Sequence, residues 1–95
     1  MWHEIILAAE AVEDLRQLPA TQRSEVVEAI EAHLRHTPAA TSRSRIKRLR
    51  GVSKPQYRLR VGDFRVFYDV IERQVEVLAI VPKSGAADWL GRVGK

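Results

Sequence analysis

Nine basic side chains lie between positions 43 and 65 of this 95-residue chain, and the only acidic residue among them is Asp63. Guanidinium groups bind phosphate oxygens through pairs of hydrogen bonds, and lysines bind them as point charges. A segment of this composition is suited to a polyanion, although a solvated loop over residues 43–50 is the simpler alternative. The nine are Arg43, Arg45, Lys47, Arg48, Arg50, Lys54, Arg58, Arg60 and Arg65.

The charge of the whole chain is divided in the same way. Residues 1–42 carry three basic and seven acidic side chains, a net charge of −4, whereas residues 43–95 carry thirteen basic and five acidic ones, a net charge of +8. A basic half beside an acidic half indicates a polyanionic partner for the basic half, and nucleic acid is the commonest such partner.

Three short apolar-rich runs follow the basic segment and are expected to be consecutive β-strands, over residues 57–61, 64–71 and 74–81. Gly62-Asp63 suits a two-residue type II′ turn between the first two strands. Glu72-Arg73 is a weaker turn signal because neither residue favours positive φ, so this connection is allowed to be longer.

Alternation along the first predicted hairpin places three arginines on one sheet face. A two-residue turn pairs Arg60 with Arg65, and Arg58 and Phe67 then lie on the same face. Like charges directly opposite each other cost roughly 0.2–1 kcal/mol, which a bound anion would offset. Phe67 is a candidate to stack on an unpaired base, with burial under the C-terminal segment as its alternative.

The third strand adds apolar side chains to this face. In the simplest register Leu78 and Ile80 lie beside Phe67 and form an apolar strip. A strip of this kind needs a cover, either Trp89 and Leu90 folding back or another chain.

The first half of the chain predicts a strand over residues 2–7 and two helices, over 8–18 and from an N-cap at Thr21 to 36, separated by Pro19. Residues 46–49 are too short to assign, 86–90 predict about one helical turn, and 91–95 are expected to fray. The order β-αα-βββ predicts an α+β fold, a helical hairpin packed on one face of a small antiparallel sheet.

Composition sets further limits. The length predicts one domain over 1–95, the absence of cysteine excludes disulfides and thiolate metal sites, and no apolar run reaches the ~20 residues of a membrane span. The first ten residues lack the features of a signal peptide, so we expect a cytoplasmic protein. His3, His33 and His36 do not have the spacing of a metal site, and neither a metal nor a cofactor is expected.

Three strings resemble the RelE/ParE toxins of type II toxin–antitoxin modules: Leu49-Arg50-Gly51, YRLRVGDFRVFY at residues 57–68 and VEVLAIV at 75–81. The resemblance covers nearly the whole chain. It implies a compact fold like that of microbial ribonucleases and a cognate antitoxin encoded beside the toxin.

The family divides in function, and so does the expectation. RelE-like members cleave mRNA on the ribosome as metal-independent endoribonucleases, which stops translation, whereas ParE-like members inhibit DNA gyrase without catalysis. A degenerate member that only binds its antitoxin is a third possibility. The RelE-like function is expected first. The residues expected to contact the RNA are Arg43, Arg45, Lys47, Arg48, Arg50, Lys54 and Phe67.

For a RelE-like enzyme the resemblance assigns catalytic roles to Arg58, Arg60 and Arg65, whereas Ser84 and Leu90 stand where an arginine and a tyrosine are expected. Arginines stabilise a pentavalent phosphate, but they are poor proton acceptors because the guanidinium stays protonated in proteins. Lys83 and Lys54 are therefore the candidate bases, if cationic neighbours lower the pKa of either amine.

Overall fold

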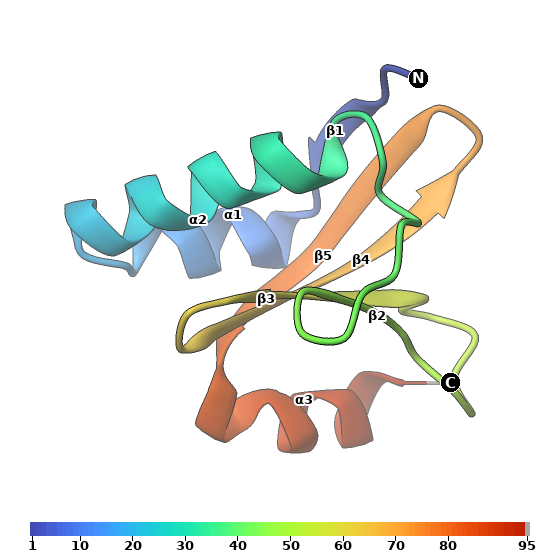
Figure 1. Cartoon of the computed structure of the whole chain (residues 1–95). Helices are drawn as coiled ribbons and strands as arrows, with labels where there is room; N and C mark the ends of the chain where they lie inside the picture. Colours follow the sequence, from blue (N-terminus) through green and yellow to red (C-terminus); the bar gives the residue numbers. More distant parts are fainter. Residues whose placement is uncertain (95) are drawn as a thin grey trace.

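The computed structural model describes residues 1–94, which form one five-stranded sheet with helices on both faces. Figure 1 shows α1 and α2 on one side of the sheet and α3 on the other. The elements are β1 (Glu4–Leu7), α1 (Ala9–Arg16), α2 (Ala20–Leu34), β2 (Ile46–Arg48), β3 (Tyr57–Val61), β4 (Phe64–Ile71), β5 (Gln74–Pro82), a 3₁₀ turn (Lys83–Gly85) and α3 (Ala86–Val93).

The α+β class is confirmed, and the sheet extends the predicted one at both edges. Its strand order is β1-β5-β4-β3-β2. β1 pairs in parallel with β5, so the sheet is mixed, whereas a wholly antiparallel sheet was expected. The short segment that carried no assignment forms β2 and pairs antiparallel with β3, and α3 is longer than one turn. Within the described residues, no helix is long and apolar enough to span a membrane.

The second helix begins two residues earlier than expected, with Pro19 in place of Thr21 as the N-cap of α2. Arg23 donates to carbonyls where α1 ends, from Nη2 to Leu18 O at 2.9 Å and from Nε to Leu15 O at 3.3 Å, the latter also accepting from Leu18 N. Helix ends need such partners because their last carbonyls have none within the helix. The tight connection holds the two helices antiparallel over the sheet.

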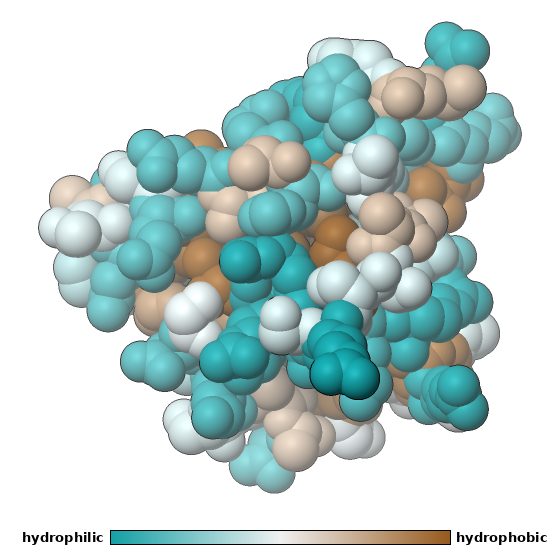
Figure 2. All heavy atoms as spheres, viewed as in Figure 1, coloured by the Kyte–Doolittle hydropathy of each residue, from teal (hydrophilic) through white to brown (hydrophobic). Residues whose placement is uncertain are grey.

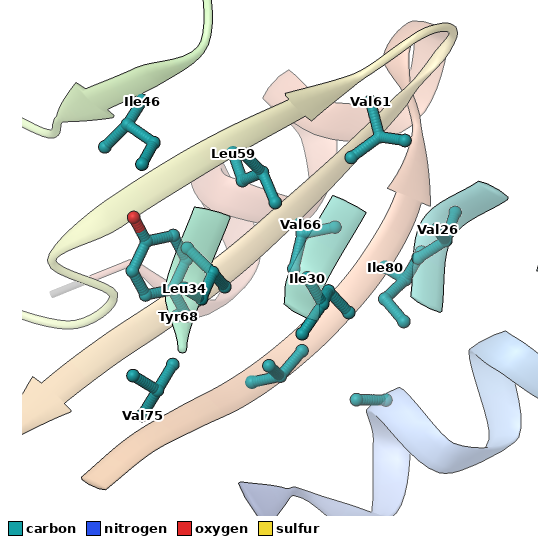
Figure 3. Close-up of a cluster of buried hydrophobic side chains, with 12 residues drawn as sticks. Val26, Ile30, Leu34, Ile46, Leu59, Val61, Val66, Tyr68, Val75 and Ile80 are labelled. Atoms are coloured by element: carbon teal, nitrogen blue, oxygen red, sulfur yellow. The ribbon is translucent and has the colours of Figure 1, made fainter. Parts of the chain in front are cut away.

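The main hydrophobic core lies between the helical hairpin and the sheet. Figure 3 shows Val26, Ile30 and Leu34 of α2 above Leu59, Val66 and Tyr68 of the sheet, all of them buried. The Tyr68 hydroxyl donates to Pro38 O at 2.6 Å, and burial raises the pKa of this phenol above its ordinary value. Tyr68 thus closes the core and anchors the loop that leaves α2.

The first hairpin has the predicted register, with Arg60 opposite Arg65 and Leu59 opposite Val66. Gly62 takes φ of +55°, the left-handed conformation that glycine adopts without cost. The second hairpin follows the predicted strand bounds at its turn and does not use the longer connection that was allowed for it. Its connection is also only two residues long, because Glu72 itself adopts φ of +55° and Ile71 pairs directly with Gln74.

A β-bulge in β5 changes which side chains lie under α3. Phe67 is opposite Ala79 but Tyr68 is opposite Val77, so Leu78 has no partner in the register. The expectation that Ile80 shares a face with Phe67 is wrong, because beyond the bulge Ile80 turns into the main core. Ala79 and Val81 take that place in a second, smaller cluster.

Candidate nucleic-acid interface

The basic surface runs from the loop before β2 across β2 and β3. Lys47 lies opposite Arg58 in the β2–β3 register, and Arg60 lies opposite Arg65 in the β3–β4 register. Figure 2 shows the most hydrophilic side chains gathered over this loop and the neighbouring strands. Cross-strand pairs of like charge are unfavourable, so the surface is poised to accept an anion.

Arg65 is not the exposed residue that the alternation predicted. The side chain is buried, with 7% of its surface accessible, and Nη1 donates to Gly62 O at 3.0 Å and to Phe64 O at 2.9 Å. Its guanidinium therefore holds the turn of its own hairpin. Arg65 contributes positive potential to the face, but one edge of its fork is occupied by backbone.

Arg58 is half-buried, and its Nε is buried without a hydrogen-bond partner among the described residues. Loss of solvation lowers the pKa of this guanidinium, and the charges of Arg65 and Arg60 lower it further. A buried donor that lacks a partner costs free energy, which an anion placed against it would recover. Arg58 is thus the arginine of this face best prepared for a ligand.

Phe67 is not available to stack on a base. The ring is only 2% exposed and stacks on Trp89 of α3, with ring centroids 4.7 Å apart and an angle of 15° between the planes. Leu90 packs against the same cluster. The alternative of a C-terminal segment folding back over the strip is confirmed, and it removes the apolar part of the face from solvent.

Lys54 is held by two carboxylates instead of facing a phosphate. Its Nζ lies 3.5 Å from Asp69 Oδ2 and 3.5 Å from Glu76 Oε1. The charges of Asp69 and then Glu76 raise the pKa of Lys54 above its ordinary value. The hypothesis that Lys54 serves as a base with a lowered pKa is therefore wrong.

Lys83 remains beside the basic face as an exposed residue at the start of the 3₁₀ turn. Its backbone N–H donates to Asp63 O at 2.7 Å, which joins the end of β5 to the first hairpin turn. Ser84 is exposed in the same 3₁₀ turn. Leu90 lies in α3 and packs against the second, smaller cluster. Neither supplies the charge or the acid expected at those positions.

The remaining basic residues lie on the exposed edge of the sheet. Arg43, Arg45 and Lys47 are exposed, and the Arg48 guanidinium carbon lies 5.0 Å from the centroid of the Tyr57 ring. Arg50 is exposed in the turn that leaves β2. Within the described residues, none of the arginines from 43 to 65 forms an ion pair with a carboxylate.

A small polar pocket of about 230 Å³ opens at the end of this surface, lined by Ser44, Arg45, Arg60 and Gly62. Ser44 and Gly62 were not candidates from the sequence, because a serine in a loop and a turn glycine carry no ligand signal by themselves. The hydrogen bond from Arg60 N to Arg45 O at 2.8 Å brings these two arginines together.

These observations define a surface of unpaired positive charge more clearly than an acid–base pair. Tyr68 is buried, and Tyr57 is half-buried between the Tyr68 ring, with ring centroids 5.4 Å apart, and the Arg48 guanidinium, so neither is a freely exposed phenol. Electrostatic stabilisation of a phosphate needs only fixed positive charge. Arg45, Arg58 and Arg60 provide that charge in the part of the chain that the structure describes.

The family model of the ParE toxin of type II toxin–antitoxin systems, parDE, matches residues 5–86. No curated protein sequence gives a significant match.

Solved structures share the fold. The toxin–antitoxin complex RelBE2 from Mycobacterium tuberculosis matches with a TM-score of 0.74 and 23% identity over 86% of this chain and 99% of that chain. The archaeal RelE–RelB complex from Pyrococcus horikoshii matches with a TM-score of 0.71 and 24% identity over 87% of this chain and 97% of that chain. A mutant of the E. coli toxin RelE in the free state matches with a TM-score of 0.71 and 19% identity over 98% of this chain and 99% of that chain.

At these identities the solved structures establish the fold, whereas the family model spans most of the sequence. The chain is therefore a toxin of the RelE/ParE superfamily and belongs to the family of ParE toxins of type II toxin–antitoxin systems.

Proposed function

We propose that this toxin acts as a RelE-like endoribonuclease on mRNA at the ribosome. The observation that carries the proposal is the run of arginines on β3 and the β2 edge that lack carboxylate partners among the described residues. Ribosome and mRNA together present the dense phosphate surface that such a run binds. The solved structures that share the fold are RelE toxins, which favours the same reading.

The proposed chemistry is attack of a ribose 2′-oxygen on the adjacent phosphorus, which forms a 2′,3′-cyclic phosphate as the 5′-oxygen departs and takes a proton from water. Arg58 and Arg60 stabilise the added negative charge on the phosphate in the transition state. Proton removal from the 2′-hydroxyl falls to solvent hydroxide or to Lys83, since Lys54 is held by Asp69 and Glu76. The enzyme then gains most of its rate from charge stabilisation and from positioning on the ribosome.

A pH profile of single-turnover cleavage on programmed ribosomes tests this mechanism. Without a protein base, the logarithm of the rate should rise by about one for each pH unit between about pH 6 and 9. A plateau at alkaline pH that disappears in Lys83→Met would assign the base to Lys83. Absence of cleavage at every pH would refute the enzymatic proposal.

The second candidate is ParE-like inhibition of DNA gyrase without catalysis. The specific observation that favours it is the burial of Arg65 and Phe67, which leaves the face without two of its expected ligand contacts. The matching family model is that of ParE toxins. Gyrase supercoiling assays run beside the ribosome assay separate the candidates, because a gyrase toxin blocks supercoiling and leaves mRNA intact. A degenerate member would do neither.

We further propose that a cognate antitoxin covers the helical hairpin in the cytoplasm. The antitoxin is expected either over the strip of Phe67, Leu78 and Ile80 or over the helical hairpin, but α3 covers the strip and Ile80 lies in the main core. The hairpin offers a different site, a groove of about 250 Å³ lined by Leu7, Val12, Leu15, Arg16 and Arg23. An acidic, amphipathic antitoxin segment would pair with the arginines and bury the aliphatic side chains.

Val12→Asp is expected to weaken capture of the toxin by its co-expressed antitoxin at least tenfold, because it places a charge in the apolar groove. Val27→Asp is the matched control, since Val27 is similarly exposed, at 42% against 37% for Val12, but does not line the groove. Equal effects of the two substitutions on the dissociation constant would rule out this groove.

A further inference from the structure

Arg45 lines two pockets, and the second has no role in the proposed reaction. The first is the 230 Å³ pocket that Arg45 shares with Arg60 at the end of the basic face. The second has a volume of about 280 Å³ and is lined by His33, Thr37, Ala40, Ser42, Arg45 and Ile46. Because one side chain belongs to both walls, the pockets adjoin at the edge of the sheet.

The position of Arg45 is fixed on both sides. Its N–H donates to Ser42 Oγ at 2.9 Å, and its carbonyl accepts from Arg60 N at 2.8 Å. Ser42 N in turn donates to Ile46 O at 2.9 Å, which closes the turn before β2. The other wall is anchored where Tyr68 donates to Pro38 O. A site held in this way loses little conformational entropy when it binds.

The walls of the second pocket suit a nucleoside. Thr37 and Ser42 provide hydroxyl groups, His33 provides an imidazole, and Ala40 and Ile46 provide apolar surface. No aspartate or glutamate lines the second pocket, whereas the Glu25 carboxylate comes close to Gly62 of the first pocket. Burial, and then the charge of Arg45, lower the pKa of His33, which keeps the imidazole neutral near pH 7 and able to donate or accept a hydrogen bond.

We propose that a single-stranded RNA segment leaves the basic face at Arg60, places one phosphate on Arg45 and inserts the next nucleoside into the second pocket. Single-stranded RNA is the fitting class because its bases are free to splay out of a stack and enter a pocket. This inference rests on RNA being the ligand in the proposed function, and it extends the contact beyond the reacting nucleotides.

Equilibrium binding to non-cleavable oligonucleotides tests the inference without requiring catalysis. Fluorescence anisotropy would compare 2′-O-methyl RNAs of about three to nine nucleotides, a range set by known site sizes on single strands. Wild-type affinity should rise with length. Ala40→Trp, which fills the second pocket without changing charge, should abolish the gain from the added nucleotides and leave the shortest oligonucleotide unaffected.

Arg45→Gln should weaken binding of the longer oligonucleotides about tenfold and reduce the slope of log K against log salt by about 0.7, the value for one phosphate contact on a single strand. Arg43→Gln removes the same charge from the same loop but lines neither pocket, so its loss should be much smaller. Arg73→Gln, in the turn after β4, supplies a charge-matched control far along the sheet.

Two results would overturn the inference. Equal losses of RNA affinity for Arg43→Gln and Arg45→Gln would show diffuse electrostatic attraction. An Ala40→Trp variant whose affinity still rises with oligonucleotide length would show that the second pocket binds no nucleoside. If Ala40→Trp does not fold, Thr37→Glu introduces a repelling charge into the same pocket. If the Arg45→Gln and Ala40→Trp variants bind an acidic antitoxin peptide more weakly but bind RNA as the wild type does, the pockets belong to the antitoxin-binding site. Normal RNA binding without cleavage on ribosomes would refute the proposed function alone.

Discussion

At the scale of single residues, the guanidinium of Arg65 is used to stabilise the turn of its own hairpin, which leaves less of it available to a ligand. Alternation along the strand predicted its face correctly but not its exposure, because exposure depends on what lies above the face. The side chain bends back to the carbonyls of Gly62 and Phe64. The same pattern of letters would describe an arginine reaching into solvent, so the sequence carries no signal for this contact.

Arg65→Ala is expected to lower the free energy of unfolding by about 1.5–3 kcal/mol, the usual value of hydrogen bonds made by a charged group. Arg60→Ala, at the exposed residue opposite, should cost less than about 0.5 kcal/mol because it relieves a like-charged pair. Urea unfolding of both variants makes the comparison. Equal stability of the two would show that the turn does not depend on Arg65.

Asp14 gives the fold a dependence on pH. Its Oδ2 accepts from Ile80 N at 2.9 Å, and its pKa is raised by partial burial, while the bond to Ile80 opposes this and Glu10 and Glu13 add to it. A carboxyl whose pKa is raised on folding binds protons more readily in the folded state. Its contribution to stability is therefore complete below the ordinary Asp pKa of about 3.9 and is lost as pH rises through the folded value.

Asp14→Asn keeps an acceptor for Ile80 N but does not titrate. Relative to this variant, the wild type should gain stability as the pH is lowered from 7 into the range just above the ordinary Asp pKa. Melting curves of both proteins at several pH values give the difference directly. A difference in melting temperature that stays constant across this range would contradict the assignment to Asp14.

At the scale of elements, the sequence predicts what depends on neighbours along the chain. The register of the first hairpin follows from Gly62 and the alternation of its strands, and it is confirmed. The bulge at Leu78 was not predictable, because every residue from Val77 to Val81 is apolar and a shift of one position leaves the pattern unchanged. Phe67 was misassigned as a ligand contact because the length and packing of α3 were not visible in the sequence.

Trp89 is the buried side chain of α3, and Leu90 and Val93 pack against the same cluster. Trp89 stacks on Phe67, and its indole N–H donates to Glu10 Oε2 at 2.6 Å. Trp89→Ala should reduce the free energy of unfolding by about 3 kcal/mol, within the range for buried aromatic truncations.

The same substitution should make the backbone of α3 exchange its amide hydrogens far faster than the rest of the protein. Trp2→Ala is the control, since Trp2 is 57% exposed and its loss should change stability by no more than about 0.5 kcal/mol. Unchanged exchange in α3 of the Trp89 variant would mean that other contacts hold the helix.

At the scale of the whole molecule, the uneven charge distribution governs encounter with both proposed partners. Association with ribosomes should weaken steeply as salt is raised, because phosphate contacts release counterions. An Arg45→Gln/Arg58→Gln/Arg60→Gln triple variant should bind more weakly at low salt and show a shallower salt dependence. Co-sedimentation with ribosomes at several salt concentrations makes the comparison. A triple variant with wild-type binding and slope would exclude this surface from the interface.

The pairing of β1 with β5 also determines when the chain becomes a toxin during its synthesis. Glu4 lies beside Gln74 in the register, so β1 cannot join the sheet until β5 is present to pair with it. Contacts between such distant segments form late, since the intervening chain must be closed into a loop at an entropic cost. The sheet that supports the basic face is therefore incomplete until β5 has been synthesised. Under the proposed function, this order of strands delays the toxin's activity to the end of its own synthesis, and an antitoxin that binds α1 and α2 as proposed would meet its site before the toxin is complete.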